Sequence, residues 1–236
     1  MRRRLFRIYV GLLAAATLAY SLSWGLPWLF PRVSPNLPRV SYSLADTARL
    51  ASRPNQPGYD RDAFGGWARV GPCSTRELAM TAVYHHDGCR SFGQAVDPYT
   101  GRLMLADDTE IDHIVPLAAA WDLGAWQWDA QTRRRFANDP LNLVVTSAEA
   151  NQDKSDQLPA SWLPSARRNR CWYARRVGAV VDAYQLALPS SDARAMLRQC
   201  PDDWWRVGGW RRGSRASTPL SSEFFDRVFT RKTTDV

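Results

Sequence analysis

Two stretches of this chain combine residue types that suit chemistry at a phosphate ester. Asp112 and His113 are adjacent in the first, and the second begins at Asn142 and ends at Asn151, with Lys154 three residues further on. Carboxylate and amide oxygens are hard ligands that suit Mg²⁺ or Mn²⁺ rather than Zn²⁺. A histidine beside such an ion can take a proton from water. These residues therefore indicate hydrolysis of a phosphodiester assisted by a divalent cation.

Local sequence patterns place these side chains on two strands and a helix. Residues Thr109–Val115 read as a strand that carries the Asp-His pair, and Leu141–Val145 as a short apolar strand. Ser147 is a good helix N-cap, so the helix that follows it carries Asn151 and Lys154. A strand with Asp-His, a second strand and a helix with Asn make up a ββα-metal core.

The remaining patterns predict an α+β fold in which helices surround this core. β structure is expected over Gly88–Met104, with its turn at Asp97–Gly101. The expected helices lie at Leu44–Ala51 (short), Thr75–Met80, Ala118–Ala125, Asp129–Ala137, Arg167–Leu186 and Asp192–Gln199.

Composition divides the chain into four parts. Residues 1–30 are a signal peptide or membrane anchor, and residues 31–58 are rich in Pro, Ser and Asn and read as a linker. The catalytic domain is expected over residues 59–200. The Gly-, Arg- and Ser-rich residues 201–236 read as a C-terminal tail that is partly disordered.

The N-terminus indicates a location outside the cytoplasm. Basic residues Arg2–Arg4 precede an uncharged stretch, Ile8–Phe30, that is long enough to cross a bilayer. Ala19–Ser21 is an imperfect cleavage site, and Trp24 and Trp28 resemble an interfacial belt, which favours an anchor. Whether cleaved or anchored, the body of the protein is predicted to be extracytoplasmic, with a membrane as partner only if the segment is retained.

Four cysteines, at positions 73, 89, 171 and 200, support the same compartment. They contain no CxxC pair, which argues against a zinc site, and their even number suggests two disulfides. Of the three possible connectivities we favour Cys73–Cys89 with Cys171–Cys200, because each pair is then local within its own segment.

The net charge of +8 and pI of about 9.7 favour a polyanionic partner such as nucleic acid or anionic lipid. A coding bias toward Arg is an alternative source of this charge, since Lys154 and Lys232 are the only lysines. Charge is therefore weak evidence by itself.

The chain resembles the HNH (His-Me finger) endonucleases. Asp112–Pro116 with Asn142–Asp156 looks like the HNH domain of RNA-guided CRISPR nucleases. Over roughly Tyr59–Cys200 the chain looks closer to secreted or membrane-anchored actinobacterial HNH nucleases grouped with the GmrSD C-terminal domain. The motifs that carry the wider likeness are Cys73–Arg76, Asp97–Gly101, Asp112–Trp121, Arg135–Asp139, Trp162–Pro164 and Cys171–Tyr173.

The resemblance implies a role for each residue. His113 would be the general base, and Asp112 and Asn151 the metal ligands. Asn142 would be the middle Asn that braces the loop and orients the histidine. Lys154 would reach a phosphate. The segment between His113 and Asn142 is longer than in compact HNH motifs, so Asn138 competes for the middle role.

Several other residues have both a functional and a structural interpretation. Glu110 could orient a metal-bound water or simply begin a strand, and Arg133–Arg135 could contact phosphate or form a solvated helix face. His85 and His86 match no motif and read as structural or surface residues. Five tryptophans could stack on bases but read more often as core, namely Trp121, Trp126, Trp128, Trp162 and Trp172.

The sequence therefore predicts an extracytoplasmic DNA endonuclease with one Mg²⁺, little sequence preference and a histidine base; Mn²⁺ is a possible substitute and RNA a possible substrate. No protein partner is implied. The alternative is a catalytically inactive nucleic-acid-binding or uptake protein on the same fold. Since a free histidine titrates near ~6.5, activity is expected to fall below about that pH.

Overall fold

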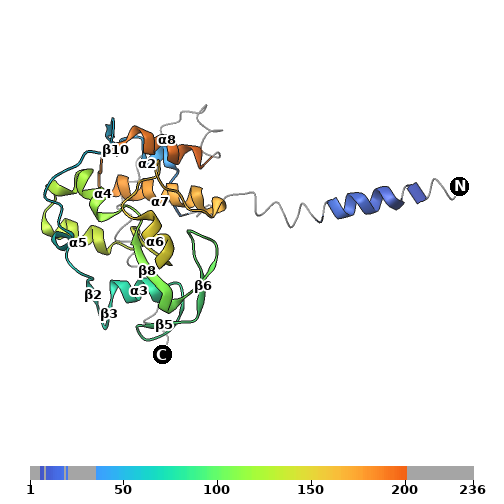
Figure 1. Cartoon of the computed structure of the whole chain (residues 1–236), viewed down its shortest axis with the longest axis horizontal. Helices are drawn as coiled ribbons and strands as arrows, with labels where there is room; N and C mark the ends of the chain where they lie inside the picture. The colour runs from blue at the N-terminus through green and yellow to red at the C-terminus, as the bar shows by residue number, and fades with distance from the viewer. Residues whose placement is uncertain (1–5, 8, 19, 21–35, 201–236) are drawn as a thin grey trace.

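Two strands and one helix form the centre of the molecule (Figure 1). β8 (Thr109–His113) pairs antiparallel with β9 (Leu143–Ser147), so that Asp112 lies opposite Val144 and His113 opposite Leu143. α6 (Ala148–Lys154) follows directly, and the Ser147 hydroxyl caps its N-terminus by accepting from the Ala150 amide. The ββα order expected from the sequence is thus present.

The structure, a computed structural model, describes residues 6–7, 9–18, 20 and 36–200. The expected tail at 201–236, and most of the stretch interpreted as signal peptide or anchor, lie outside the described residues. Within the described part of the chain, no helix has the length and apolar character needed to cross a membrane.

Helices and short two-stranded sheets surround the centre, which confirms the α+β class. Within residues 36–200 the other helices are α2 (Val40–Ser43), α3 (Thr75–Thr81), α4 (Leu117–Asp122), α5 (Ala130–Asn138), α7 (Arg170–Ala183) and α8 (Ser190–Arg198). The other strands are β1 (Arg49–Leu50), β2 (Arg69–Val70), β3 (Cys73–Ser74), β4 (His85–Asp87), β5 (Arg90–Phe92), β6 (Gln94–Val96), β7 (Leu103–Leu105) and β10 (Leu188–Pro189). Single 3₁₀ turns are η1 (Arg61–Phe64), η2 (Ala106–Asp108), η3 (Ala125–Gln127) and η4 (Arg167–Asn169).

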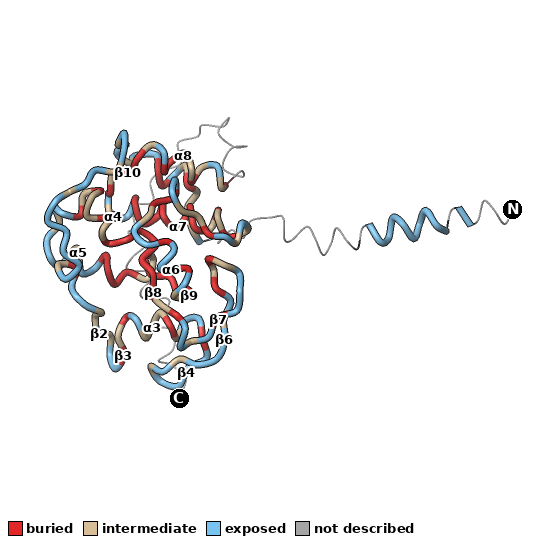
Figure 2. The backbone as a smooth tube through the Cα atoms, in the orientation of Figure 1, coloured by how far each residue is buried: buried red, intermediate tan, exposed pale blue. Residues whose placement is uncertain are grey.

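The main core lies between α7 and the elements around it, and the buried trace in Figure 2 runs through α7, α4 and β8. α7 is buried on most of its surface, as its apolar positions Val177, Val180 and Val181 predicted. Tyr173 on the same helix packs edge-on against Tyr99, with ring centroids 5.8 Å apart. Apolar burial of this kind stabilises by about 25 cal/mol per Å².

The expected linker at residues 31–58 is corrected by the structure, because its later part folds into the domain. Val40 and Leu44 are buried in the main core, and α2 packs against α7. Gly178 permits this approach, since a Cβ there would lie 3.2 Å from the Cβ of Ser43. β1 then pairs in parallel with β10. Val40 and Leu44 have helical spacing, but they span only one turn in a Pro- and Ser-rich stretch, which is too short for a periodic pattern to reveal this packing.

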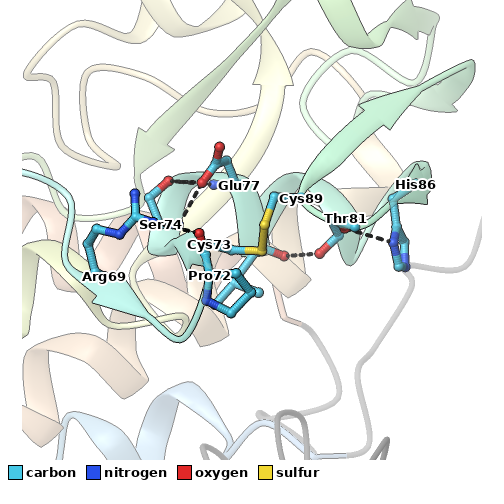
Figure 3. The surroundings of a disulfide bond; sticks show 10 residues. Arg69, Pro72, Cys73, Ser74, Glu77, Thr81, His86 and Cys89 are labelled. Atoms are coloured by element: carbon cyan, nitrogen blue, oxygen red, sulfur yellow. Dashed lines mark hydrogen bonds between the residues drawn. A yellow bond between two sulfur atoms is a disulfide. The ribbon is translucent and has the colours of Figure 1, made fainter.

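Both expected disulfides are present, Cys73–Cys89 and Cys171–Cys200. Figure 3 shows the first beside a capping box at the start of α3, in which the Ser74 amide donates to the Glu77 carboxylate and the Ser74 hydroxyl accepts from the Glu77 amide. The disulfide therefore ties the hairpin of β4 and β5 to β3, at the residue that precedes the N-cap of α3.

The β structure expected over Gly88–Met104 divides into parts of two hairpins, β4–β5 and β6–β7. The turn of the second begins at Asp97, as predicted, and its carboxylate is fully buried. Asp97 accepts from the Tyr99 amide within the turn, and from the hydroxyls of Thr146 and Ser147 at the junction of β9 and α6. This carboxylate thus fastens the hairpin to the ββα centre.

Replacing Asp97 by Ala should destabilise the fold by about 3 kcal/mol or more, because several buried donors lose their acceptor. Burial alone would raise the pKa of Asp97, but its hydrogen bonds outweigh burial and hold the pKa below its usual value. The stabilisation is therefore present at neutral pH and is lost as the pH falls below about 4. Urea unfolding at several pH values measures both effects.

Asp107→Ala, which removes an exposed carboxylate, is the matched control and should leave the unfolding free energy almost unchanged. Equal stability of the two variants at neutral pH would contradict the role given to Asp97.

Candidate active site

His113 is held by a backbone hydrogen bond and an aromatic ring. It ends β8, is 7% exposed, and its Nε2 lies 2.8 Å from the carbonyl oxygen of Ala137 at the end of α5. The Trp67 ring is nearly parallel to the imidazole, with centroids 6.0 Å apart and planes within 5°. A carbonyl can only accept, so Nε2 carries the proton and Nδ1 presents a lone pair.

Burial lowers the pKa of His113 to about 4, although the bond to the Ala137 carbonyl acts in the opposite direction. The imidazole is therefore neutral at pH 7, the form that a base requires. The expectation that the base is lost below about pH 6.5 assumed a solvated histidine. With its pKa lowered to about 4, buried His113 is instead expected to stay mostly neutral at pH 5.

Asn142 is hydrogen-bonded to the loop that follows His113. It is fully buried, its Oδ1 accepts from the Val115 amide at 2.9 Å, and its backbone carbonyl accepts from the Ile114 amide at 2.7 Å. These bonds fix the backbone immediately after His113.

Asn138, the competing candidate, acts elsewhere. Its Oδ1 accepts from the Ala68 amide and its Nδ2 donates to the Gly66 carbonyl, so it holds residues 66–68 against α5. Trp67 lies between those two contacts. Asn142 thus holds the backbone that follows His113, and Asn138 holds the segment that carries the Trp67 ring.

Both oxygens of the buried Asp112 carboxylate are engaged. Oδ1 accepts from the Lys154 ammonium at 2.9 Å and Oδ2 from the Tyr99 hydroxyl at 2.5 Å. Burial raises the pKa of Asp112 and lowers that of Lys154, while their mutual attraction opposes both shifts. Each carboxylate oxygen retains a second lone pair, so these bonds leave acceptor capacity at Asp112.

Lys154 lies in a different place from the one that its expected role requires. Its side chain is 0% exposed, and its ammonium also donates to the His113 carbonyl at 2.8 Å. The ammonium therefore faces the protein interior beneath β8, not a position that a substrate phosphate can reach. Lys154 sits at i+3 from Asn151, as the sequence indicated, but on the buried side of α6.

The Asn151 side chain, also on α6, contacts Glu110 rather than Asp112. Its Nδ2 donates to the Glu110 carboxylate at 2.7 Å, which leaves its Oδ1 as the free acceptor. Glu110 therefore orients the amide.

Two hollows meet at the histidine. The first, here called the Asn151 hollow, is lined by Tyr59, Arg61, Ile111, Asp112, His113, Pro116, Leu117, Ala118, Asn151, Ser155 and Asp156. The second, the Trp67 hollow, is lined by Arg61, Asp62, Gly65, Gly66, Trp67, His113, Leu117, Ala137 and Asn138. The structure thus brings the predicted base and both predicted ligands to one cavity.

The donors in the Asn151 hollow fit a hydrated Mg²⁺. Asp112 and Asn151 offer one carboxylate and one amide oxygen, and Mg²⁺ usually keeps several waters beside one or two protein ligands. Among the described residues no group of three or more His, Cys, Asp or Glu side chains could enclose an ion. The fit is therefore to a weakly held ion that substrate and water help to coordinate.

The other candidates serve mainly structural roles. Arg133 donates to the carbonyls of Ala63 and Trp128, so it is not a free phosphate contact, whereas Arg134 and Arg135 are exposed. Four of the five tryptophans are partly buried against the main core, Trp121, Trp128, Trp162 and Trp172, while Trp126 is 44% exposed. His85 and His86 are exposed on β4.

Sequence reasoning missed two residues of the site, Arg61 and Trp67. Both precede the ββα centre by about forty residues or more and match none of the motifs that carry the resemblance. Tyr99 was visible only as part of a turn motif; its contact with Asp112 depends on tertiary packing. No local signal in the sequence would have identified any of the three.

Comparison of the chain with known proteins identifies its family. The family of GmrSD restriction endonucleases, C-terminal domain, matches residues 79–199. An uncharacterized secreted protein of Arthroderma benhamiae is 37% identical over 180 residues, covering 70% of this chain and 88% of that relative. No solved structure matches the chain.

Lys154→Met should destabilise the protein by about 3–5 kcal/mol, because Asp112 is then left charged and buried without its counter-ion. The double variant Asp112→Leu/Lys154→Met removes both charges and should recover much of that loss. Urea unfolding of the wild type, both single variants and the double variant measures the coupling. Strictly additive losses would contradict a buried, interacting pair.

Proposed function

Because the chain belongs to the family of GmrSD restriction endonuclease C-terminal domains, we propose that it is an extracytoplasmic, metal-dependent HNH endonuclease that hydrolyses DNA with little sequence preference. The observation that carries the proposal is the setting of His113. Its Nε2 is committed to the Ala137 carbonyl, and the residue lines one cavity with Asp112 and Asn151.

In this proposal Nδ1 of His113 takes the proton from the water that attacks phosphorus. Burial keeps the imidazole neutral and Trp67 fixes its plane, so the base needs no rearrangement before it acts. Asn142 holds the loop after the histidine, which preserves the direction of the lone pair. Bond formation from the water oxygen is balanced by departure of the 3′ oxygen of the cleaved strand.

Asp112 and Asn151 would hold a Mg²⁺, which when bound supplies positive charge against the phosphate in the transition state. The remaining work belongs to the chain itself. Tyr99 and Lys154 fix the Asp112 carboxylate, and Glu110 fixes the Asn151 amide, so both oxygens are oriented by bonds to their neighbours.

The extracytoplasmic location rests on two independent features. The relative in Arthroderma benhamiae is described as secreted. Both cysteine pairs form disulfides, which persist in oxidising compartments.

His113→Ala should lower the rate of plasmid nicking in Mg²⁺ by about 10²–10⁴-fold, the usual contribution of a general base. Supercoiled plasmid is incubated with the oxidised protein in Mg²⁺ or EDTA, and the products are separated on agarose. His86→Ala removes an exposed histidine outside the site and serves as the matched control. Wild-type activity in the His113 variant would overturn the mechanism.

A wild-type protein that binds DNA but does not nick it in Mg²⁺ or Mn²⁺ would favour the non-catalytic alternative. One feature of the site is compatible with that outcome, since Lys154 offsets the charge of the carboxylate meant for the metal.

Asn151→Ala should weaken Mn²⁺ binding by about tenfold or more, the scale expected when a metal site loses a supporting group. Paramagnetic resonance of free Mn²⁺ measures this without any turnover. Gln152→Ala, the exposed neighbour on α6, is the control. Asp is not a conservative choice at position 151, because it would face the Glu110 carboxylate. Equal Mn²⁺ affinities of the two variants would remove Asn151 from the ligand set.

A further inference from the structure

One cationic side chain lines both hollows that meet at the histidine. Arg61 borders the Asn151 hollow and the Trp67 hollow, as do His113 and Leu117. Arg61 precedes the residues matched by the family, which begin at 79, so the match assigns it no role.

The backbone that carries Arg61 is rigidly placed. It begins η1, whose Phe64 is fully buried against Phe136, with ring centroids 6.2 Å apart. Arg133 on α5 donates to the Ala63 carbonyl of the same turn at 3.2 Å. The Arg61 side chain itself is exposed. The backbone therefore fixes where the Arg61 side chain starts, and its solvated guanidinium is accessible to an anion.

The charges around Arg61 leave it available. Of the carboxylates in the Asn151 hollow, Asp112 is paired with Lys154 and Asp156 with Arg53. Asp60 and Asp62 flank Arg61 in the sequence, and Asp62 lines the Trp67 hollow with it, while the Asp60 carboxylate accepts from the Asp62 amide. In the described part of the chain, Arg61 takes part in no ion pair or side-chain hydrogen bond. A planar guanidinium with five donors is well suited to two oxygens of a phosphate.

We infer that Arg61 binds a backbone phosphate of DNA beside His113, and that the bound strand runs from the Asn151 hollow to the Trp67 hollow past the imidazole. The inference rests on the proposed nuclease function and adds the residue that positions its substrate. Since the contact is to a phosphate, it is independent of base sequence.

The test is binding in EDTA, where metal-dependent cleavage cannot occur. Fluorescence anisotropy of a labelled DNA duplex of mixed sequence is measured with the full-length chain across a series of salt concentrations. Arg61→Ala is compared with Arg61→Lys and with Arg194→Ala. Arg194 is exposed on α8 and lines neither hollow, so its loss changes the net charge equally.

Arg61→Ala should weaken binding about tenfold and reduce the slope of log K against log salt by about one phosphate contact. Arg61→Lys should retain the slope, because the charge is kept, with affinity between those of the wild type and the Ala variant. Arg194→Ala should match the wild type in both. Melting temperatures equal to that of the wild type confirm folding.

Equal affinity and slope for Arg61→Ala and Arg194→Ala would overturn the inference. Failure of the proposed function is a separate result: a wild-type protein that does not nick plasmid in Mg²⁺ fails as a nuclease, while the binding comparison still decides whether Arg61 contacts phosphate.

Discussion

The structure depends on the burial of one ammonium group. Lys154 is 0% exposed, and a lone buried ammonium would cost several kcal/mol, so the surroundings must supply acceptors. They do so with the Asp112 carboxylate and the His113 carbonyl. Asp112 then needs a second donor, which is Tyr99, and the turn containing Tyr99 is fastened by Asp97. A continuous set of polar bonds therefore runs from α6 through β8 to the β6–β7 hairpin and back to the start of α6.

The groups that hold the Asp112 carboxylate lie on a different side of it from the cavity. The ammonium and the tyrosine hydroxyl fix the carboxylate from the protein side, which leaves the cavity side of Asp112 to face Asn151 and His113. The ion pair also offsets the negative charge of the carboxylate. Two oxygen ligands and little net charge make a poor cage for a cation, so the chemistry that we propose depends on substrate phosphate as a further partner for the ion.

Much of the centre was predictable because its signals are local. An N-cap at Ser147, two apolar strands before it and a turn at Asp97 each follow from a few neighbouring residues. All four elements form, although the first strand ends at His113 rather than Val115 and the second lies at Leu143–Ser147 rather than Leu141–Val145. The direction of the Lys154 side chain was not predictable: position i+3 from Asn151 fixes its place along α6, but burial beneath β8 decides which way it points. The packing of Val40 against α7 was likewise not predictable, because it depends on tertiary contacts.

The ββα centre is incomplete without residues that precede it in the chain. It supplies the base, the two oxygen ligands and the bracing amide of the mechanism that we propose, but the ring beside His113 and the nearby cation come from residues 59–67. Asn138 and Arg133, both on α5, hold that segment in place by bonds to its backbone. The helical insert between the two strands, which lengthens the motif relative to compact HNH enzymes, is therefore the element that docks the outer wall of the site. A chain that lost the insert would keep the histidine but lose the Ala137 carbonyl that sets its tautomer.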